Sequence, residues 1–170
     1  MTQLRTGDVV TIDGEPNLVI TRIFGSPAEA VWQTMTDTHW LREWIGYWEG
    51  DPTTGHVSFF MTAEGDDPEP QRYTILECDR PRRFAGIAGE AVGAWRLWFE
   101  LEEVAGVTTL TFGQLLTPGE DIGSIGPGWE YYLDRAHEAH EGRDASAIVW
   151  DDYYPALRDE YAALAPQPGA

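Results

Sequence analysis

Residues 18–48 read LVITRIFGSPAEAVWQTMTDTHWLREWIGYW, and this stretch decides the fold. It opens with β-branched and aromatic residues and no breaker, which predicts a strand over residues 18–24. A turn at Gly25-Ser26-Pro27 follows. Ser26 is expected to be the N-cap of a helix, with Pro27 at its first position and Glu29 completing an S-x-x-E capping box.

Two short amphipathic helices are predicted after this turn. Apolar residues recur at helical spacing over 28–35, and a second helix is expected to start at Asp37 or Thr38 and to end at Gly46. Each helix therefore has an apolar face that the rest of the chain must cover. The residues of these two faces are Ala28, Val31, Trp32, Met35, Trp40, Leu41, Trp44 and Ile45.

The middle of the chain is typical of antiparallel strands joined by short turns. Alternation is clearest in AWRLWFELE, where Trp95, Leu97, Phe99 and Leu101 share one face. The turn-rich segments 49–55 and 65–70 are expected to be loops. The pattern predicts an antiparallel meander that joins the N-terminal strands, giving a sheet of about six or seven strands. The expected strands are 8–12 and 18–24, which form a hairpin around 13–16, followed by 57–62, 72–78, 83–88, 94–102 and 108–116.

A long helix is expected to follow the sheet. Residues 117–128 are rich in Gly and Pro and are read as a connection, so that Pro127 starts the helix and Gly142 ends it. A further helical segment is predicted near 151–164, within a C-terminal extension of about 147–164. Residues 1–7 and 165–170 are expected to be frayed ends. The whole chain, 1–170, is read as one domain with its core at about 17–142.

Composition limits the classes of function. The chain has 170 residues, 29 acidic against 11 basic side chains, and a formal net charge of −18. This charge disfavours binding to nucleic acids and to anionic membranes. The single cysteine, Cys78, permits no internal disulfide and suits a reducing cytoplasm. Neither a signal peptide nor an apolar run of membrane length is expected. A homodimer is left open.

The local sequence resembles the SRPBCC (START-like) superfamily, and within it the branch named for the activator of heat-shock protein 90 ATPase. The resemblance covers roughly residues 17–142. Its motifs are Arg22, Pro27 and the Val31-Trp32 pair, Gly55, ILECDRPRRF at 75–84, TTLTF at 108–112 and Gly128-Trp129-Glu130. It implies an α+β helix-grip fold with a cavity between the curved sheet and the C-terminal helix. The GDDPEP loop at 65–70 and the last helical segment are departures that put the form of the cavity mouth in doubt.

The resemblance implies a protein that binds a small hydrophobic or aromatic ligand in this cavity. One alternative is a protein-interaction role, such as a co-chaperone that modulates an ATPase. The separate N-terminal domain of the eukaryotic co-chaperone is not expected in this chain, which weakens that alternative. A cyclase-type enzyme is the second alternative, but the inward positions are almost wholly apolar, and an enzyme would place ionisable groups there. No cofactor is expected. His137 and His140 are three apart on a helix, but no further ligand completes a metal site.

The expected ligand-binding residues face the cavity from the sheet, the long helix and the second short helix. Gln114 is a special case, because its parity places an amide among apolar neighbours, and a buried amide needs partners. Two indoles, Trp95 and Trp129, are expected to oppose each other across a flat slot. The expected set is Trp44, Phe59, Met61, Tyr73, Trp95, Leu97, Phe99, Phe112, Gln114, Trp129, Tyr132 and Leu133.

Overall fold

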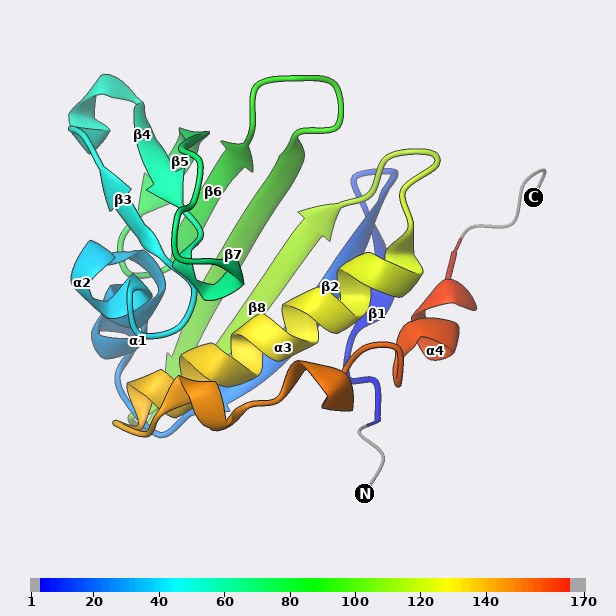
Figure 1. Ribbon diagram of the computed structural model, residues 1–170. Coiled ribbons are helices and arrows are strands. Elements are labelled where there is room, and N and C mark those ends of the chain that lie inside the picture. The colour runs from blue at the N-terminus through cyan, green and yellow to red at the C-terminus, as the bar shows by residue number, and fades with distance from the viewer. Residues whose placement is uncertain (1–3, 166–170) are drawn as a thin grey trace.

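A computed structural model describes residues 4–165 as a curved antiparallel sheet with a long helix across one face (Figure 1). The spatial order of the eight strands is β1-β2-β8-β7-β6-β5-β4-β3. The strands are β1 (Asp8–Ile12), β2 (Glu15–Phe24), β3 (Tyr47–Glu49), β4 (His56–Phe60), β5 (Gln71–Asp79), β6 (Arg83–Ala88), β7 (Trp95–Val104) and β8 (Val107–Leu115). This arrangement confirms the predicted α+β helix-grip fold.

The helices lie between β2 and β3 and after β8. The α-helices are α1 (Ala28–Thr36), α2 (Thr38–Leu41), α3 (Ile122–His140) and α4 (Arg158–Ala162). Single 3₁₀ turns are η1 (Pro52–Thr54), η2 (Thr62–Glu64), η3 (Ala145–Ala147) and η4 (Trp150–Asp152). Within residues 4–165, no helix combines the length and apolar character needed to span a membrane.

The N-terminal hairpin forms as predicted, with a shorter loop. β1 and β2 are joined by Asp13 and Gly14, both at positive φ (51° and 82°). Asp-Gly suits such a two-residue turn, since Asp tolerates and Gly favours the left-handed region. Glu15 and Pro16, which were expected in the loop, are the first residues of β2.

The sheet has one strand more than expected, because β3 falls where the second helix and the 49–55 loop meet. α2 ends at Leu41 rather than at Gly46, and turns carry the chain to Ile45. Tyr47–Glu49 then pairs with β4. A strand of three residues shows too little alternation to be detected from sequence.

The core confirms the predicted parity of β7. Leu97, Phe99 and Leu101 are buried, whereas Arg96 and Glu100, on the opposite face of the strand, are exposed. Trp32 of α1 reaches this face, and its ring lies 5.4 Å from that of Phe99, centroid to centroid. The short helix α1 is therefore anchored on the sheet through one indole.

The predicted capping box at Ser26 is wrong. Pro27 is the N-cap of α1, and the N-cap residue makes no side-chain capping hydrogen bond. The amide N–H of Ala28 instead donates to Oε1 of Glu103 at 2.7 Å, from the end of β7. The Ser26 hydroxyl lies 2.8 Å from Nε2 of His140, and Glu29 pairs with Arg80. Ser26 and Glu29 therefore contact residues far away in the sequence and do not cap the helix.

The long helix starts earlier than predicted. α3 begins at Ile122, so residues 122–128 are helical and Pro127 lies inside the helix. Its glycines serve close packing: a Cβ at Gly126 would lie 2.3 Å from the ring of Tyr161. The Gly/Pro content that suggested a loop therefore reflects the approach of the C-terminal extension.

The C-terminal extension is less helical than predicted, and the N-terminus is more ordered. Between residues 151 and 164 only Arg158–Ala162 is α-helical, since Pro155 interrupts the pattern. At the other end, the backbone amides of Thr6 and Gly7 donate to Glu130 of α3 at 2.7 and 3.1 Å. Residues 6 and 7 are therefore held against α3. Of the expected frayed ends, residues 1–3 and 166–170 lie outside the described residues.

Candidate ligand-binding cavity

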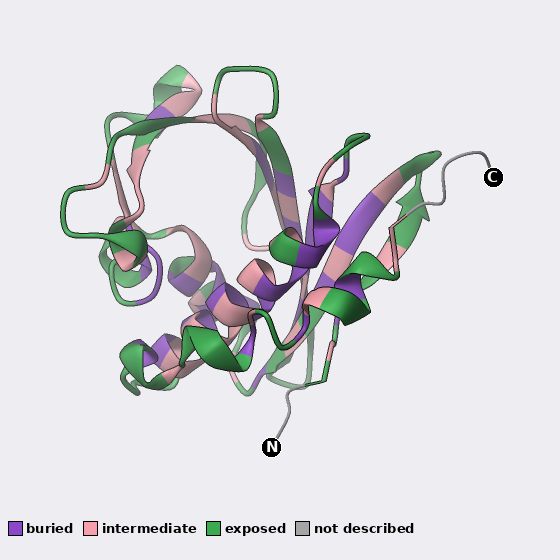
Figure 2. Ribbon diagram, turned by 45° about the vertical axis from the view of Figure 1, so that its right-hand side comes forward, coloured by how far each residue is buried: buried purple, intermediate pink, exposed green. Residues whose placement is uncertain are grey.

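A cavity of about 1160 Å³ lies between the concave face of the sheet, α1, α2 and α3. Figure 2 shows the curl of the sheet, whose strands contribute to the cavity wall. Its wall draws on every strand from β3 to β8, so the curl of the sheet creates it. The exposed residues 90–93 lie at one end, and Cys78 and Arg80 lie at the other, so the cavity reaches solvent.

The wall includes most of the side chains expected from the sequence. Gln114 and Leu133, although fully buried, do not belong to it. Trp40, expected on the apolar face of the second short helix, is exposed and lies outside the lining. The expected residues that do line the cavity are Trp44, Phe59, Met61, Tyr73, Trp95, Leu97, Phe99, Phe112, Trp129 and Tyr132.

Gln114 lies behind the wall and holds Trp129. The indole N–H of Trp129 donates to Oε1 of Gln114 at 2.6 Å. An indole N–H can only donate, so the facing atom of the amide must be its oxygen. This leaves Nε2 of Gln114 without a hydrogen-bond partner among the described residues. The amide thus has the buried, apolar surroundings that its parity predicts, and its contact is with a lining residue.

The expected slot between Trp95 and Trp129 is closed. The two ring centroids are 6.2 Å apart with an interplanar angle of 59°, so the indoles contact each other. Trp129 also packs on Phe112, at 4.5 Å between centroids, and on Tyr132, at 6.2 Å. These four rings form one aromatic cluster at the α3 side of the cavity. The space between the two indoles is therefore not open to a flat molecule, and the cluster presents ring surface to the cavity.

The opposite wall is built around Tyr73 of β5. Its ring stacks on Phe84 of β6, with centroids 6.1 Å apart and planes 24° apart. It also lies over Gly86, where a Cβ would come within 2.3 Å of Cε1 of the tyrosine ring. Glycine at 86 therefore allows the ring to lie flat on the neighbouring strand.

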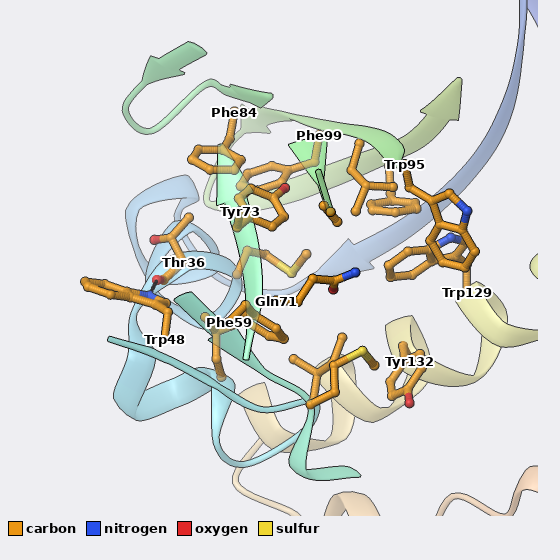
Figure 3. A pocket seen from close by; sticks show the side chains of 18 of the residues that line it. Thr36, Trp48, Phe59, Gln71, Tyr73, Phe84, Trp95, Phe99, Trp129 and Tyr132 are labelled. Atoms are coloured by element: carbon orange, nitrogen blue, oxygen red, sulfur yellow. Dashed lines mark hydrogen bonds between the residues drawn. The ribbon is translucent and has the colours of Figure 1, made fainter. Parts of the chain in front are cut away.

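Gln71 is a lining residue that sequence reasoning missed. It is the first residue of β5 and lines the cavity, and Figure 3 shows its side chain extending among Phe59, Tyr73 and Trp129. The strand was expected to start at residue 72. Gln71 is two residues from Tyr73 and therefore shares its inward face. This spacing was the available signal, and the GDDPEP loop before it concealed the start of the strand.

Hydrogen bonds tie the cavity rim at two places. The Tyr132 hydroxyl donates to Oε1 of Glu64 at 2.8 Å and so connects α3 with η2. Burial, reinforced by this carboxylate, raises the pKa of Tyr132, so its hydroxyl stays protonated and donates. On the α1 side, Nε1 of Trp48 donates to the carbonyl oxygen of Thr36 at 2.9 Å (Figure 3).

The charged and imidazole clusters of α3 lie outside the cavity. Arg22 of β2 is bound by Glu130 at 2.7 Å and Asp134 at 2.8 Å, and none of the three lines the cavity. Nδ1 of His140 lies 2.8 Å from Oγ1 of Thr34, and burial lowers the pKa of this imidazole. Nε2 of His137 lies 3.1 Å from the Ile23 carbonyl oxygen. Within residues 4–165, no group of three or more His, Cys, Asp or Glu side chains is arranged to hold a metal ion.

A sheet that grips a C-terminal helix around an internal cavity defines a START-like protein. The comparison with protein families agrees with this class. The model of the family described as "Activator of Hsp90 ATPase homolog 1-like protein" matches residues 26–141, and the chain belongs to this family.

Solved structures share the fold at low sequence identity. The crystal structure of CalU16 from Micromonospora echinospora has a TM-score of 0.69 and 22% identity, over 95% of this chain and 96% of that one. The protein BPP1335 from Bordetella parapertussis has a TM-score of 0.69 and 21% identity, over 96% and 93%. DynU16, a putative protein in the dynemicin biosynthetic locus, has a TM-score of 0.63 and 19% identity, over 76% and 49%. No protein of curated function matches the sequence.

Proposed function

We propose that this protein binds a small, largely apolar or aromatic molecule in the cavity between the sheet and α3. The observation that carries the proposal is the cavity of about 1160 Å³ with an aromatic wall. Ligand pockets typically enclose roughly 300–1000 Å³ and combine apolar walls with a few polar groups. This cavity therefore has the size and surface of a ligand site.

The aromatic wall supports a flat ligand. Phe112, Trp129 and Tyr132 present ring faces from one side, and Tyr73 and Phe84 present a stacked pair from the other. Offset stacking between such rings and an aromatic ligand adds about 0.5–1.5 kcal/mol per pair beyond area burial. An aromatic molecule can gain this stacking free energy on both walls of the cavity.

The ionic groups support a ligand without net negative charge. Asp37, Glu64 and Glu90 are acidic lining residues, and Arg80 at one end is the basic member of the described lining. Burying an anion without a cationic partner is costly. A cytoplasmic setting belongs to the proposal as well, and the exposed free thiol of Cys78 supports it.

The proposal is tested by titrating the wild-type protein with N-phenyl-1-naphthylamine, a neutral aromatic probe. Seven of the tryptophans (32, 44, 48, 95, 98, 129 and 150) line the cavity, so their emission should be quenched saturably. Probe at about 100 times its Kd should add about 2.7 kcal/mol of stability and raise the Tm by about 5–10 °C. Quenching that rises linearly without saturation, with an unchanged Tm, would contradict the proposal. The protein surface would then become the place to look for a partner, as the co-chaperone alternative expects.

A further inference from the structure

Gln71 and Tyr73 are two polar residues that line the largely apolar cavity from one strand. Gln71 and Tyr73 are two residues apart on β5, so they lie on the same face, and both line the cavity. Figure 3 shows the Gln71 amide near the Tyr73 ring, with the cluster of Trp95 and Trp129 beyond it. An amide and a phenol hydroxyl thus share one part of the wall.

The Tyr73 hydroxyl is held in place by its ring. The ring is fixed between the stack on Phe84 and the backbone at Gly86, which leaves little freedom for the direction of the hydroxyl. Burial raises the pKa of Tyr73 well above its usual range, so the group remains a protonated donor.

Neither group is occupied by another residue, whereas two other donors of the wall are already engaged. Neither side chain makes a hydrogen bond to another residue within 4–165. By contrast, the indole N–H of Trp129 donates to Gln114, and the Tyr132 hydroxyl donates to Glu64. The unengaged donors of the Gln71–Tyr73 pair therefore face the space where a ligand would lie.

We propose that Gln71 and Tyr73 form a two-donor site for a neutral oxygen acceptor, so that the preferred ligand is an aromatic molecule bearing a ring carbonyl. This inference rests on the proposed function and specifies its ligand class. The amide N–H and the phenol O–H both donate, and a carbonyl oxygen has two lone pairs to accept them. A carboxylate is disfavoured because Arg80, the arginine among the described lining residues, lies at the Cys78 end of the cavity. Arg72, the intervening residue, lies on the opposite face of β5 and pairs with Glu90.

The test compares fluorene with 9-fluorenone, which share a tricyclic frame and differ by one carbonyl. The Kd of each compound is measured by tryptophan quenching for the wild type, Gln71→Leu and Tyr73→Phe. In each variant the affinity for fluorenone should fall about 3- to 10-fold, while that for fluorene stays within about 2-fold. Thr74→Val is the matched control, because it also removes a polar group from β5, but at a position that does not line the cavity. It should leave both Kd values unchanged.

The outcomes separate this inference from the proposed function. If the wild type binds both compounds and both variants keep its preference between them, the two-donor site is wrong and the cavity still binds ligands. Equal losses for fluorene and fluorenone also overturn the inference, because the side chains would then act by shape alone. If the wild type binds neither compound, the proposed function fails together with the inference. Thermal denaturation checks that each variant is folded. If Gln71→Leu does not fold, the more conservative variant Tyr73→Phe tests the two-donor site by itself.

Discussion

The indole nitrogen of Trp129 donates a hydrogen bond of 2.6 Å to Oε1 of the fully buried Gln114. This bond orients the central ring of the aromatic cluster, which touches Trp95, Phe112 and Tyr132. A single amide behind the wall thus sets the ring face that Trp129 turns to the cavity. Under the proposed function, Gln114 affects ligand binding through Trp129.

The first prediction follows from that relationship. Gln114→Leu should weaken fluorene and fluorenone by the same factor, because it loosens Trp129 and leaves the donors on β5 intact. Trp129→Leu should weaken both compounds more strongly, since it removes the central ring. Parallel Kd measurements check this, and the emission of Trp129 should change in Gln114→Leu. A selective loss of fluorenone binding in Gln114→Leu would instead make Gln114 a direct ligand contact.

The second prediction concerns the core at Phe99. Phe99→Ala should lower the free energy of unfolding by about 3–5 kcal/mol, since it removes a buried ring packed on Trp32 and Phe84. Urea denaturation measures the change. Val104→Ala, on the exposed end of the same strand, is the control and should cost less than about 0.5 kcal/mol. An unchanged midpoint for Phe99→Ala would contradict the observed parity of β7.

The third prediction concerns Glu130, which joins both ends of the chain to α3. Its carboxylate accepts from the amides of Thr6 and Gly7, from Arg22 and from the Tyr161 hydroxyl. Glu130→Gln should destabilise the protein by about 2–4 kcal/mol at pH 7. This is somewhat less than the full cost of breaking a buried ion pair, because Arg22 keeps Asp134 as a partner.

The stabilisation from Glu130 should depend on pH. Burial alone would raise the pKa of Glu130, but hydrogen bonds from Thr6, Tyr161 and Arg22 outweigh it and hold the pKa below its usual value. The folded state thus favours the ionised form. Its contribution is fully present above the unfolded pKa of about 4.3 and is lost as the pH falls through the folded pKa. The difference between wild type and Glu130→Gln should therefore shrink in urea denaturation below about pH 4. A constant difference from pH 7 to pH 3 would show that the carboxylate charge is not the cause.

The fourth prediction concerns the rim contact between Tyr132 and Glu64. Tyr132→Phe removes the donor that holds η2 to α3 and should increase the dissociation rate of a bound probe by about 2- to 10-fold. Stopped-flow displacement of N-phenyl-1-naphthylamine measures this rate. Tyr47→Phe is the control, because Tyr47 stacks on Phe60 outside the cavity. Equal rates for the wild type and Tyr132→Phe would show that this contact does not limit release.

The sequence was informative where one local period dominates. Alternation over residues 95–101 placed Leu97 and Phe99 on the cavity face, and the Asp13-Gly14 turn placed the first hairpin. It was misleading where distant residues decide the local structure. Glu103 caps α1 in place of Ser26, and Tyr161 requires the glycine at 126 that suggested a loop. These contacts join residues far apart in the chain and leave no periodic signal.

In the candidate site, too, local periodicity predicted some features and distant contacts decided others. The aromatic wall follows from inward parity, and most of its members were identified. The direction of polar atoms does not follow from parity, because it depends on which partner a side chain meets. Gln114 is satisfied in part by Trp129, whereas Gln71, hidden beside a turn-rich loop, points into the cavity. Three-dimensional contacts were needed to tell the two amides apart.

The central claim, that the cavity itself holds the ligand, is tested most directly by filling it. Ala88 of β6 lines the cavity and lies between Tyr73 and Trp95 on the paired strands, so Ala88→Trp places an indole in the ligand space. Ile87→Trp, one residue away on the opposite face, adds the same side chain outside it. The measurement is the Kd of N-phenyl-1-naphthylamine for both variants and the wild type, with the fold checked by circular dichroism. We predict that Ala88→Trp loses binding by at least about 10-fold while Ile87→Trp binds like the wild type. Equal binding by all three proteins would contradict the account.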